Sequence, residues 1–257
     1  MTSSSIWSSG RYESVAEQIE VIACDVVDAV AARLPLRGAA LVDLACGTGN
    51  AALSAVAHGA RVTGVDITQE LLAIAAAKPA GDSVTWLTAD ASCTGLPTGA
   101  YDAAVSNMGI IFVEPVSQVA ELGRLVRAGG ILGFSAWSRG TSNPFFDPIV
   151  GVLGRPSPSG YSPDQWGDPA TIADRLSADF DDVDIATGPF TWRFDSLASA
   201  IAFVTTESPM HVNVFRHVGD ARDRLVSAFE AAFAAHLDEA ERIAFDAPYV
   251  VVTAKRR

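Results

Sequence analysis

The chain has 257 residues, of which 49% are apolar and 19% are charged, a composition typical of a globular protein that excludes general disorder. Acidic residues outnumber basic ones by 30 to 18, for a formal net charge of -12, so we expect the surface to repel nucleic acids and anionic membranes. The three cysteines fit no metal-ligand spacing, and the N-terminus shows neither a signal-peptide pattern nor a membrane-spanning run, so we expect a reduced, cytoplasmic protein without a metal.

The first part of the chain predicts a helix followed by a strand, a tight turn and a second helix. Apolar residues recur with a helical period over 19–34, within an N-terminal helical segment that we place at 1–38. A short apolar run at 41–44 then leads into Gly47-Thr48-Gly49, and an Ala-rich helical pattern follows at once. Because glycine accepts a positive φ and lets backbone N–H groups approach a ligand closely, this turn predicts a nucleoside cofactor site.

Strands and helices alternate from there to residue 137, which we take as a cofactor-binding core at 39–137. The expected strands are 61–66, 83–89, 101–106 and 131–137, and the expected helices are 68–78 and 116–126. Gly129-Gly130 is interpreted as the break before the fifth strand. This alternation favours a parallel sheet with right-handed crossovers.

The remaining chain changes character at residue 138. Residues 138–168 are rich in Pro and Gly and are interpreted as a loop or lid. A short helix is expected from Pro169 to about Ala178, followed by a strand at 183–194, a helical insertion at 196–246 with breaks at Pro209 and Gly219, and a last strand at 249–253. The whole chain is expected to form one domain, with the insertion at 196–246 as a cover over the substrate site.

Three carboxylates indicate which nucleoside is bound. Gly47-x-Gly49-x-x-Ala52 with Asp66 also fits a dinucleotide pattern, which leaves an NAD(P)-dependent oxidoreductase open. However, Asp43, Asp66 and Asp90 all fall at the carboxyl ends of expected strands, where they would repel a pyrophosphate but accept hydrogen bonds from amines and ribose hydroxyls. S-adenosylmethionine (SAM) has these groups, a positive charge and no phosphate.

At this point several segments resemble the successive motifs of class I SAM-dependent methyltransferases, in the UbiE/Coq5-like group of the Methyltransf_11/25 type. These segments are Leu41 to Gly49, Val65-Asp66, Thr88-Ala89-Asp90, Tyr101-Asp102 and Leu125 to Gly130. The C-terminal half is similar, more loosely, to an actinobacterial branch of small-molecule methyltransferases. The resemblance implies an α/β, Rossmann-like, mostly parallel sheet of seven strands in the order 3-2-1-4-5-7-6, with helices on both faces, in which 183–194 and 249–253 are the last two strands.

The resemblance also implies roles for individual residues. The turn formed by Ala45, Cys46, Gly47, Thr48 and Gly49 would pack on the methionine part and the ribose, with Asp43 nearby. Asp66 would bind the ribose hydroxyls, Ile67 would pack on the adenine, and Asp90 with Ala91 would receive the adenine amine. Asn107 and Met108 would lie near the sulfonium, and Trp7, Arg11 and Tyr12 match a segment that folds over the cofactor in relatives. The sequence departs from the family at Ala45, where glycine is common, and at Ala128, where proline is usual.

The sequence indicates less about the methyl acceptor than about the cofactor. Methyl transfer to oxygen or nitrogen requires no base, but a hydroxyl acceptor would benefit from one, and His211 and Glu114 are the candidates. Seven aromatic residues could line an apolar or aromatic acceptor pocket, namely Phe112, Trp137, Phe145, Phe146, Tyr161, Trp166 and Trp192. We therefore expect methyl transfer from SAM to O or N of a small molecule, with a SAM-binding protein without catalysis as an alternative. The oligomeric state is open, a homodimer being one option.

Overall fold

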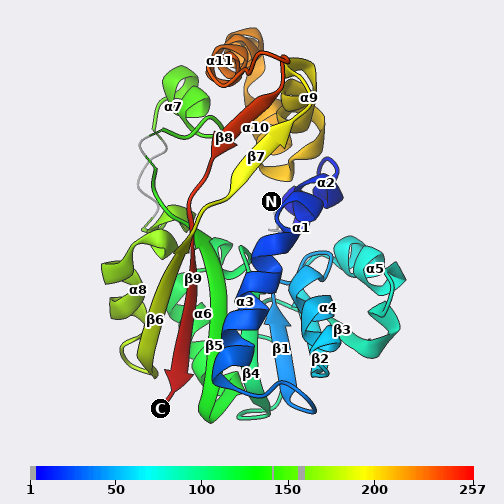
Figure 1. Cartoon of the computed structure of the whole chain (residues 1–257), viewed down its shortest axis with the longest axis vertical. Helices are drawn as coiled ribbons and strands as arrows, with labels where there is room; N and C mark the ends of the chain where they lie inside the picture. The colour runs from blue at the N-terminus through cyan, green and yellow to red at the C-terminus, as the bar shows by residue number, and fades with distance from the viewer. Residues whose placement is uncertain (1–3, 141, 156–159) are drawn as a thin grey trace. The chain divides into compact units, whose positions relative to one another are not determined.

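A computed structural model of the chain describes residues 4–140, 142–155 and 160–257 (Figure 1). The chain folds into two compact units, each built from three segments. The sheet unit comprises Ile19–Ser138, Tyr161–Gly188 and Tyr249–Arg257, and the second unit comprises Met1–Gln18, Arg139–Gly160 and Pro189–Pro248. The predicted core at 39–137 therefore lies entirely within the sheet unit.

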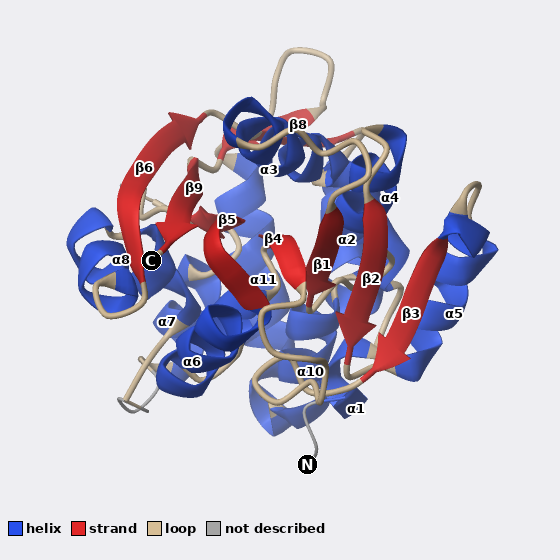
Figure 2. Cartoon of the chain, turned by 90° about the horizontal axis from the view of Figure 1, so that it is seen from below, coloured by secondary structure: helices blue, strands red, loops and turns tan. Residues whose placement is uncertain are grey.

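The sheet unit contains a seven-stranded sheet in the order β3-β2-β1-β4-β5-β9-β6. Its strands are β1 (Ala40–Leu44), β2 (Arg61–Asp66), β3 (Val84–Thr88), β4 (Tyr101–Asn107), β5 (Val126–Trp137), β6 (Phe180–Gly188) and β9 (Tyr249–Arg256). The first five strands are parallel, and β9 pairs antiparallel with both β5 and β6. The predicted order is confirmed, because β9 is the last strand that the sequence predicts (Figure 2).

Helices cover both faces of this sheet. They are α3 (Glu20–Arg33), α4 (Asn50–Ala57), α5 (Gln69–Ala77), α6 (Pro115–Leu125) and α8 (Pro169–Leu176), with short 3-10 turns at Gly81–Ser83, Ile110–Phe112 and Pro163–Gly167. In Figure 1, α3 crosses in front of the central strands and α6 lies behind them. The face that α3 turns to the sheet consists of fully buried apolar residues, including Val26, Val27 and Val30, as its sequence period predicts.

Two expected features of the sheet are wrong. Gly129-Gly130 does not precede the fifth strand but lies inside β5, which begins at Val126 directly after α6. The register between β4 and β5 shifts at this point, so the two glycines form an irregularity within the ladder, with Gly129 at a φ of +77°. The expected strand 183–194 is two strands, because Pro189 lacks an N–H group and ends the ladder after β6.

The second unit is built around a two-stranded sheet that the sequence did not predict. β7 (Thr191–Phe194) pairs antiparallel with β8 (Ile243–Asp246), so the end of the insertion expected to be helical is a strand. The described helices of this unit are α1 (Ser4–Trp7), α2 (Tyr12–Gln18), α7 (Asp147–Leu153), α9 (Leu197–Ala202), the π-helix η4 (Phe203–Glu207), α10 (Pro209–His217), the 3-10 helix η5 (Gly219–Ala221) and α11 (Arg222–Ala234).

The core of the second unit is aromatic. The ring of Phe145 lies 5.0 to 6.3 Å, between centroids, from the rings of Trp192, Phe194, Phe203, His211, Phe233 and Phe245. The segment 138–168 is therefore not only a loop: it contributes Phe145 and α7 to this unit, and from Tyr161 onward it belongs to the sheet unit. Residues 141 and 156–159 of the expected lid lie outside the described residues.

Candidate functional site

The turn between β1 and α4 is shaped by three residues in the left-handed region. Ala45, Gly47 and Gly49 have φ values of 52°, 55° and 83°, and Gly49 is the N-cap of α4. A Cβ atom on Gly49 would lie 2.6 Å from Cη2 of Trp86 on β3, so a side chain is excluded by space as well as by φ. The glycine pattern is therefore needed both for the backbone and for the packing of the neighbouring strand.

Asp43 lies under this turn with one oxygen unsatisfied. The residue is 1% exposed, and its Oδ2 accepts a hydrogen bond of 2.9 Å from the backbone N–H of Ala52 in α4. Its Oδ1 is buried without a partner among the described residues. Burial raises the pKa of this carboxyl well above its ordinary value, and the nearby charge of Asp66 adds to the effect. A buried acceptor of this kind needs a donor, and an ammonium group or an ordered water meets that need.

Asp66 at the end of β2 connects the turn to α5. Its Oδ2 accepts from the N–H of Gly47 and its Oδ1 from the N–H of Thr68, both at 2.8 Å. Burial raises the pKa of Asp66, while these hydrogen bonds oppose the rise. Because a carboxylate oxygen accepts two hydrogen bonds, each oxygen keeps capacity for a ligand hydroxyl. Thr68 occupies the N-cap position of α5 but makes no side-chain capping bond. Ile67, between Asp66 and Thr68, is half-buried.

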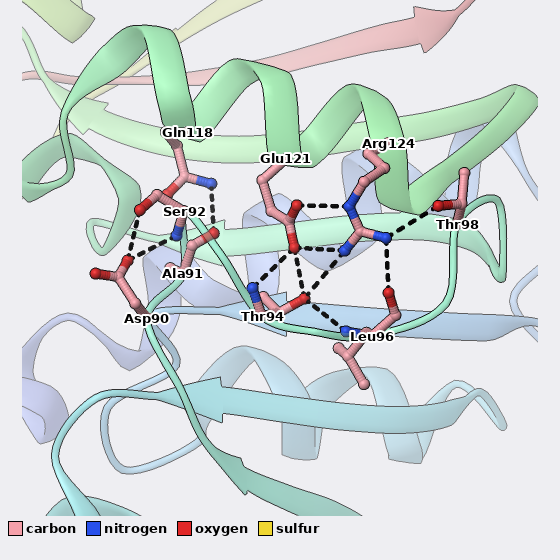
Figure 3. A network of polar contacts seen from close by, with 9 residues as sticks. All are labelled: Asp90, Ala91, Ser92, Thr94, Leu96, Thr98, Gln118, Glu121 and Arg124. Atoms are coloured by element: carbon pink, nitrogen blue, oxygen red, sulfur yellow. Dashed lines mark hydrogen bonds and ion pairs between the residues drawn. The ribbon is translucent and has the colours of Figure 1, made fainter.

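Asp90 and Ala91 follow the end of β3. The Oδ1 of Asp90 accepts from both the N–H and the hydroxyl of Ser92, at 2.8 and 2.7 Å, whereas its Oδ2 contacts no donor among the described residues (Figure 3). Ala91 is buried, and its carbonyl oxygen accepts a bond of 3.3 Å from Nε2 of Gln118 on α6. The exposed carboxylate is thus fixed by its own turn with one oxygen left for a ligand.

Asn107 and Met108 at the end of β4 are held by serines that the sequence interpretation missed. Ser135 on β5 donates to Oδ1 of Asn107 at 2.8 Å and accepts from the N–H of Met108, which has a φ of 54°. Ser106 donates to the Leu44 carbonyl at 2.7 Å and ties β4 to the end of β1. Both serines are fully buried. A polar residue inside an otherwise apolar strand is the signal that could have identified them.

These side chains share one edge of the sheet. In the order β3-β2-β1-β4, the strands are parallel, and Asp90, Asp66, Asp43 and Asn107 lie at or near their carboxyl ends. A Cβ atom on Gly109 would lie 2.3 Å from the Ala45 carbonyl oxygen, so the loops after β1 and β4 touch at this edge. Open α/β sheets bind ligands at such an edge.

The burial of Cys46 between the acids raises the pKa of its thiol well above the ordinary value, so it stays protonated.

The two candidate bases lie in different units. Glu114 is the N-cap of α6; its carboxylate accepts from the N–H groups of Val116 and Ser117, and these bonds lower its pKa. His211 belongs to the second unit, where Nδ1 lies 2.7 Å from the Ser208 hydroxyl and Nε2 lies 3.1 Å from the Phe145 carbonyl. Because the carbonyl can only accept, Nε2 carries the proton and Nδ1 is the acceptor. Burial lowers the pKa of His211 to about 4.

The N-terminal residues Trp7, Arg11 and Tyr12 also lie in the second unit. The rings of Trp7 and Tyr12 meet edge to face at 6.3 Å between centroids. The N–H of Arg11 donates to the Glu207 carbonyl at 2.8 Å, and its guanidinium lies 3.5 Å from the Glu207 carboxylate. Arg11 is therefore attached to the π-helix η4, and the approach of all three residues to a cofactor stays a prediction.

The seven aromatic residues predicted to line an acceptor pocket divide between the units. Phe145 and Trp192 are in the core of the second unit, and Phe146 is 48% exposed. Trp166 is fully buried in the sheet unit against Phe134. Tyr161 donates its hydroxyl to the Phe112 carbonyl in the same unit, at 3.3 Å. Among the described residues no group of three or more His, Cys, Asp or Glu side chains could hold a metal ion.

Comparison with known proteins agrees with this geometry. The Methyltransf_11 family, described as a methyltransferase domain, matches residues 42–134. Rv1405c, an uncharacterized protein of Mycobacterium tuberculosis, is 28% identical over 85% of this chain and 81% of its own. A malonyl-[acyl-carrier protein] O-methyltransferase of Enterobacter lignolyticus is 33% identical over 42% of this chain and 43% of its own.

A solved structure shows the same fold. Phosphoethanolamine N-methyltransferase 2 of Haemonchus contortus, in complex with phosphomonomethylethanolamine and S-adenosylhomocysteine, superposes with a TM-score of 0.55. It is 16% identical, and the match covers 90% of this chain and 52% of that one. The matched family domain spans β1 to β5, the part of the sheet that carries the three acids and the glycine turn. Residues 42–134 therefore match a methyltransferase domain of the Methyltransf_11 family, which indicates SAM as the cofactor.

Proposed function

We propose that this protein transfers the methyl group of SAM to an oxygen or nitrogen atom of a small, apolar or aromatic molecule. The observation that carries the cofactor side is the row of carboxylates at the sheet edge, with the buried and unpartnered Oδ1 of Asp43 beneath the glycine turn. A row of acids suits a ligand with a positive charge and several donors, and it opposes a pyrophosphate. The NAD(P) alternative is therefore disfavoured by charge.

The residues present fit SAM group by group. Asp43 would face the methionine ammonium, Asp66 would accept the ribose hydroxyls with its remaining lone pairs, and Asp90 with Ala91 would receive the adenine amine. When bound, SAM supplies an electrophilic methyl group on a sulfonium that loses its charge on transfer. The chain would contribute orientation and exclusion of water, since an in-line displacement gains most from a fixed approach of the two reacting atoms.

Two kinds of relative support an oxygen or nitrogen acceptor. The Enterobacter lignolyticus relative is an O-methyltransferase, and the Haemonchus contortus structure is an N-methyltransferase. His211 and Glu114 stay predictions as bases: a pKa of about 4 makes the neutral His211 ring a weak proton acceptor, and Glu114 is an exposed helix cap, so the proposed transfer is argued without either of them. The aromatic content of the second unit supports an apolar acceptor.

The partners and location that we propose follow from composition. The excess of 30 acidic over 18 basic residues supports a small-molecule acceptor instead of a nucleic acid and fits a cytoplasmic enzyme. No helix in the described part of the chain is long and apolar enough to span a bilayer.

Calorimetry with S-adenosylhomocysteine and with NAD in parallel tests the cofactor side. We expect heat with S-adenosylhomocysteine only, and heat with NAD only would refute the proposal. Asp66→Ala should weaken S-adenosylhomocysteine binding by about 1 to 3 kcal/mol. Asp102→Asn is the matched control, because this carboxylate also accepts a backbone N–H, that of Ala40, but at the opposite ends of β1 and β4. An equal loss in both variants would contradict the assignment of Asp66.

A screen of small metabolites with methyl-labelled SAM tests the acceptor side. Label should appear on an oxygen or nitrogen of an apolar or aromatic compound. Label on carbon would refute that part of the proposal, and cofactor binding without transfer to any compound would favour the non-catalytic alternative.

A further inference from the structure

The segment that carries Asp90 and Ala91 is fastened to helix α6 by three side chains. Residues 89–100 connect β3 to β4 without a helix or strand of their own. Gln118, Glu121 and Arg124 are spaced three residues apart, so they lie along one face of α6, and this face points at the segment (Figure 3). A connection of this length would otherwise be mobile, because it contributes few apolar side chains to the core.

Glu121 makes the central contact. The residue is 6% exposed, and its Oε1 accepts from both the N–H and the hydroxyl of Thr94, at 2.9 and 2.6 Å. Arg124 donates to the same carboxylate through two nitrogens, at 2.7 and 2.6 Å. Burial by itself would raise the pKa of Glu121, but the bonds from Arg124 and Thr94 outweigh it and lower the pKa to about 2. The carboxylate is therefore ionised throughout the neutral range.

The other two side chains extend the attachment in both directions. Arg124 donates to the Leu96 carbonyl at 2.7 Å and to the Thr98 hydroxyl at 3.1 Å, which fixes the C-terminal end of the segment. Gln118 is fully buried and donates to the Ala91 carbonyl, next to Asp90. The Oε1 of Gln118 has no partner among the described residues, so its amide is placed for Ala91 alone. The hydrogen bonds thus reach from residue 91 to residue 98.

We propose that Glu121 is a positioning residue for adenine recognition, which acts by holding the 90–98 segment so that Asp90 presents its Oδ2 to the adenine amine. This inference rests on the proposed function, which assigns Asp90 to the cofactor. Glu121 itself does not touch the ligand. Its effect passes through Thr94 and the backbone to Asp90, four residues earlier in the segment.

The test compares two ligands that differ in one group. S-adenosylhomocysteine carries the 6-amino group, and its purine riboside analogue carries only a hydrogen at that carbon, so Asp90 has no N–H to accept from there. General damage to the fold weakens the binding of both ligands equally, whereas a displaced Asp90 lowers the preference for the ligand with the amine. The measured quantity is the ratio of the two dissociation constants, determined by calorimetry for wild type and for Glu121→Gln, a change that keeps the shape and removes the charge. Arg127→Gln is the matched control, because Arg127 pairs with Asp102 at 2.6 Å away from this segment.

We expect wild type to prefer S-adenosylhomocysteine about tenfold to a hundredfold, because the analogue loses a hydrogen bond to a charged acceptor. Glu121→Gln should reduce that ratio by a factor of about five or more, and Arg127→Gln should leave it unchanged. An unchanged ratio in Glu121→Gln would overturn the proposal, as would a wild type that does not distinguish the ligands. If Glu121→Gln does not fold, Thr94→Val replaces it in the same measurement. We expect Thr94→Val to reduce the ratio of the dissociation constants by a smaller factor, and an unchanged ratio in this variant would overturn the proposal. If wild type binds neither ligand, that result refutes the proposed function itself and with it the inference about Glu121.

Discussion

Replacing His211 by glutamine removes a titratable ring from the aromatic core of the second unit. Burial disfavours the imidazolium and lowers the pKa of His211 to about 4 from the ordinary value of 6.5, although the bond to the Phe145 carbonyl acts in the opposite direction. In the unfolded chain the ring regains its ordinary pKa. Between pH 6.5 and 4 the unfolded state therefore binds this proton more readily than the folded state, and stability falls as the pH is lowered.

The magnitude follows from the pKa difference. A shift from 6.5 to about 4 corresponds to about 3 kcal/mol, since each pKa unit is worth about 1.4 kcal/mol. The contribution is fully present above pH 6.5 and is lost as the pH falls toward 4. Between pH 7 and pH 5 the wild type should lose about 2 kcal/mol through this residue. The His211→Gln variant lacks this loss, because glutamine does not titrate.

Urea unfolding of both proteins at pH 7, 6 and 5 measures the effect. The stability advantage of wild type over His211→Gln should shrink by about 2 kcal/mol from pH 7 to pH 5, and contributions from the other titrating groups cancel in the difference. The NMR titration of the histidine ring protons should show a signal with a midpoint near 4 that is missing in the variant. A difference in stability that is independent of pH, or a midpoint above 6, would refute the burial of a neutral His211.

Further predictions concern the glycine turn and the acid beneath it. Gly49→Ala should destabilise the protein by about 1 to 3 kcal/mol in thermal unfolding, because the new Cβ meets Trp86 and the φ is +83°; an unchanged melting temperature would contradict this packing. Ala45→Gly relieves a left-handed alanine and should change the free energy of unfolding by between 0 and about +1 kcal/mol; a clear loss would show that Ala45 is unstrained. The S-adenosylhomocysteine affinity of wild type should fall as the pH drops through the raised pKa of Asp43, while that of Asp43→Asn should be weaker and flat; parallel pH profiles would exclude Asp43 as the titrating group.

Much of the sheet unit could be predicted because its signals are local. The strand at 61–66 has the predicted bounds, and the turn at 45–49 can be predicted because the residues that form it are contiguous in the sequence. The carboxyl ends of parallel strands meet at one edge, so the order of the strands was sufficient to bring Asp43, Asp66 and Asp90 together. The sequence could not show that Asp66 also holds Gly47 and Thr68, because that role depends on the exact approach of the turn to β2.

The second unit was harder because its pairing is distant in sequence. β7 and β8 have four residues each and lie 48 residues apart, so neither shows enough alternation to reveal a strand. The proline before β7, at position 189, was the available signal that the strand 183–194 is divided. His211 shows the same limit, since a histidine beside a helix start reads as a candidate base until its neighbours Phe145 and Phe229 are known.

The glycine turn and the acids contribute differently to the cofactor site. The left-handed backbone at Ala45, Gly47 and Gly49 would serve any nucleoside ligand, because it only lets the chain approach closely. Charge decides between ligands: Asp43 is buried with an unsatisfied oxygen, an arrangement that costs free energy in the absence of a donor and that a phosphate would make worse. Such a cost is tolerated where a ligand offsets it, and a ligand that carries an ammonium group does so. If the proposed assignment is right, the buried carboxylate of Asp43 makes this turn favour SAM over a dinucleotide.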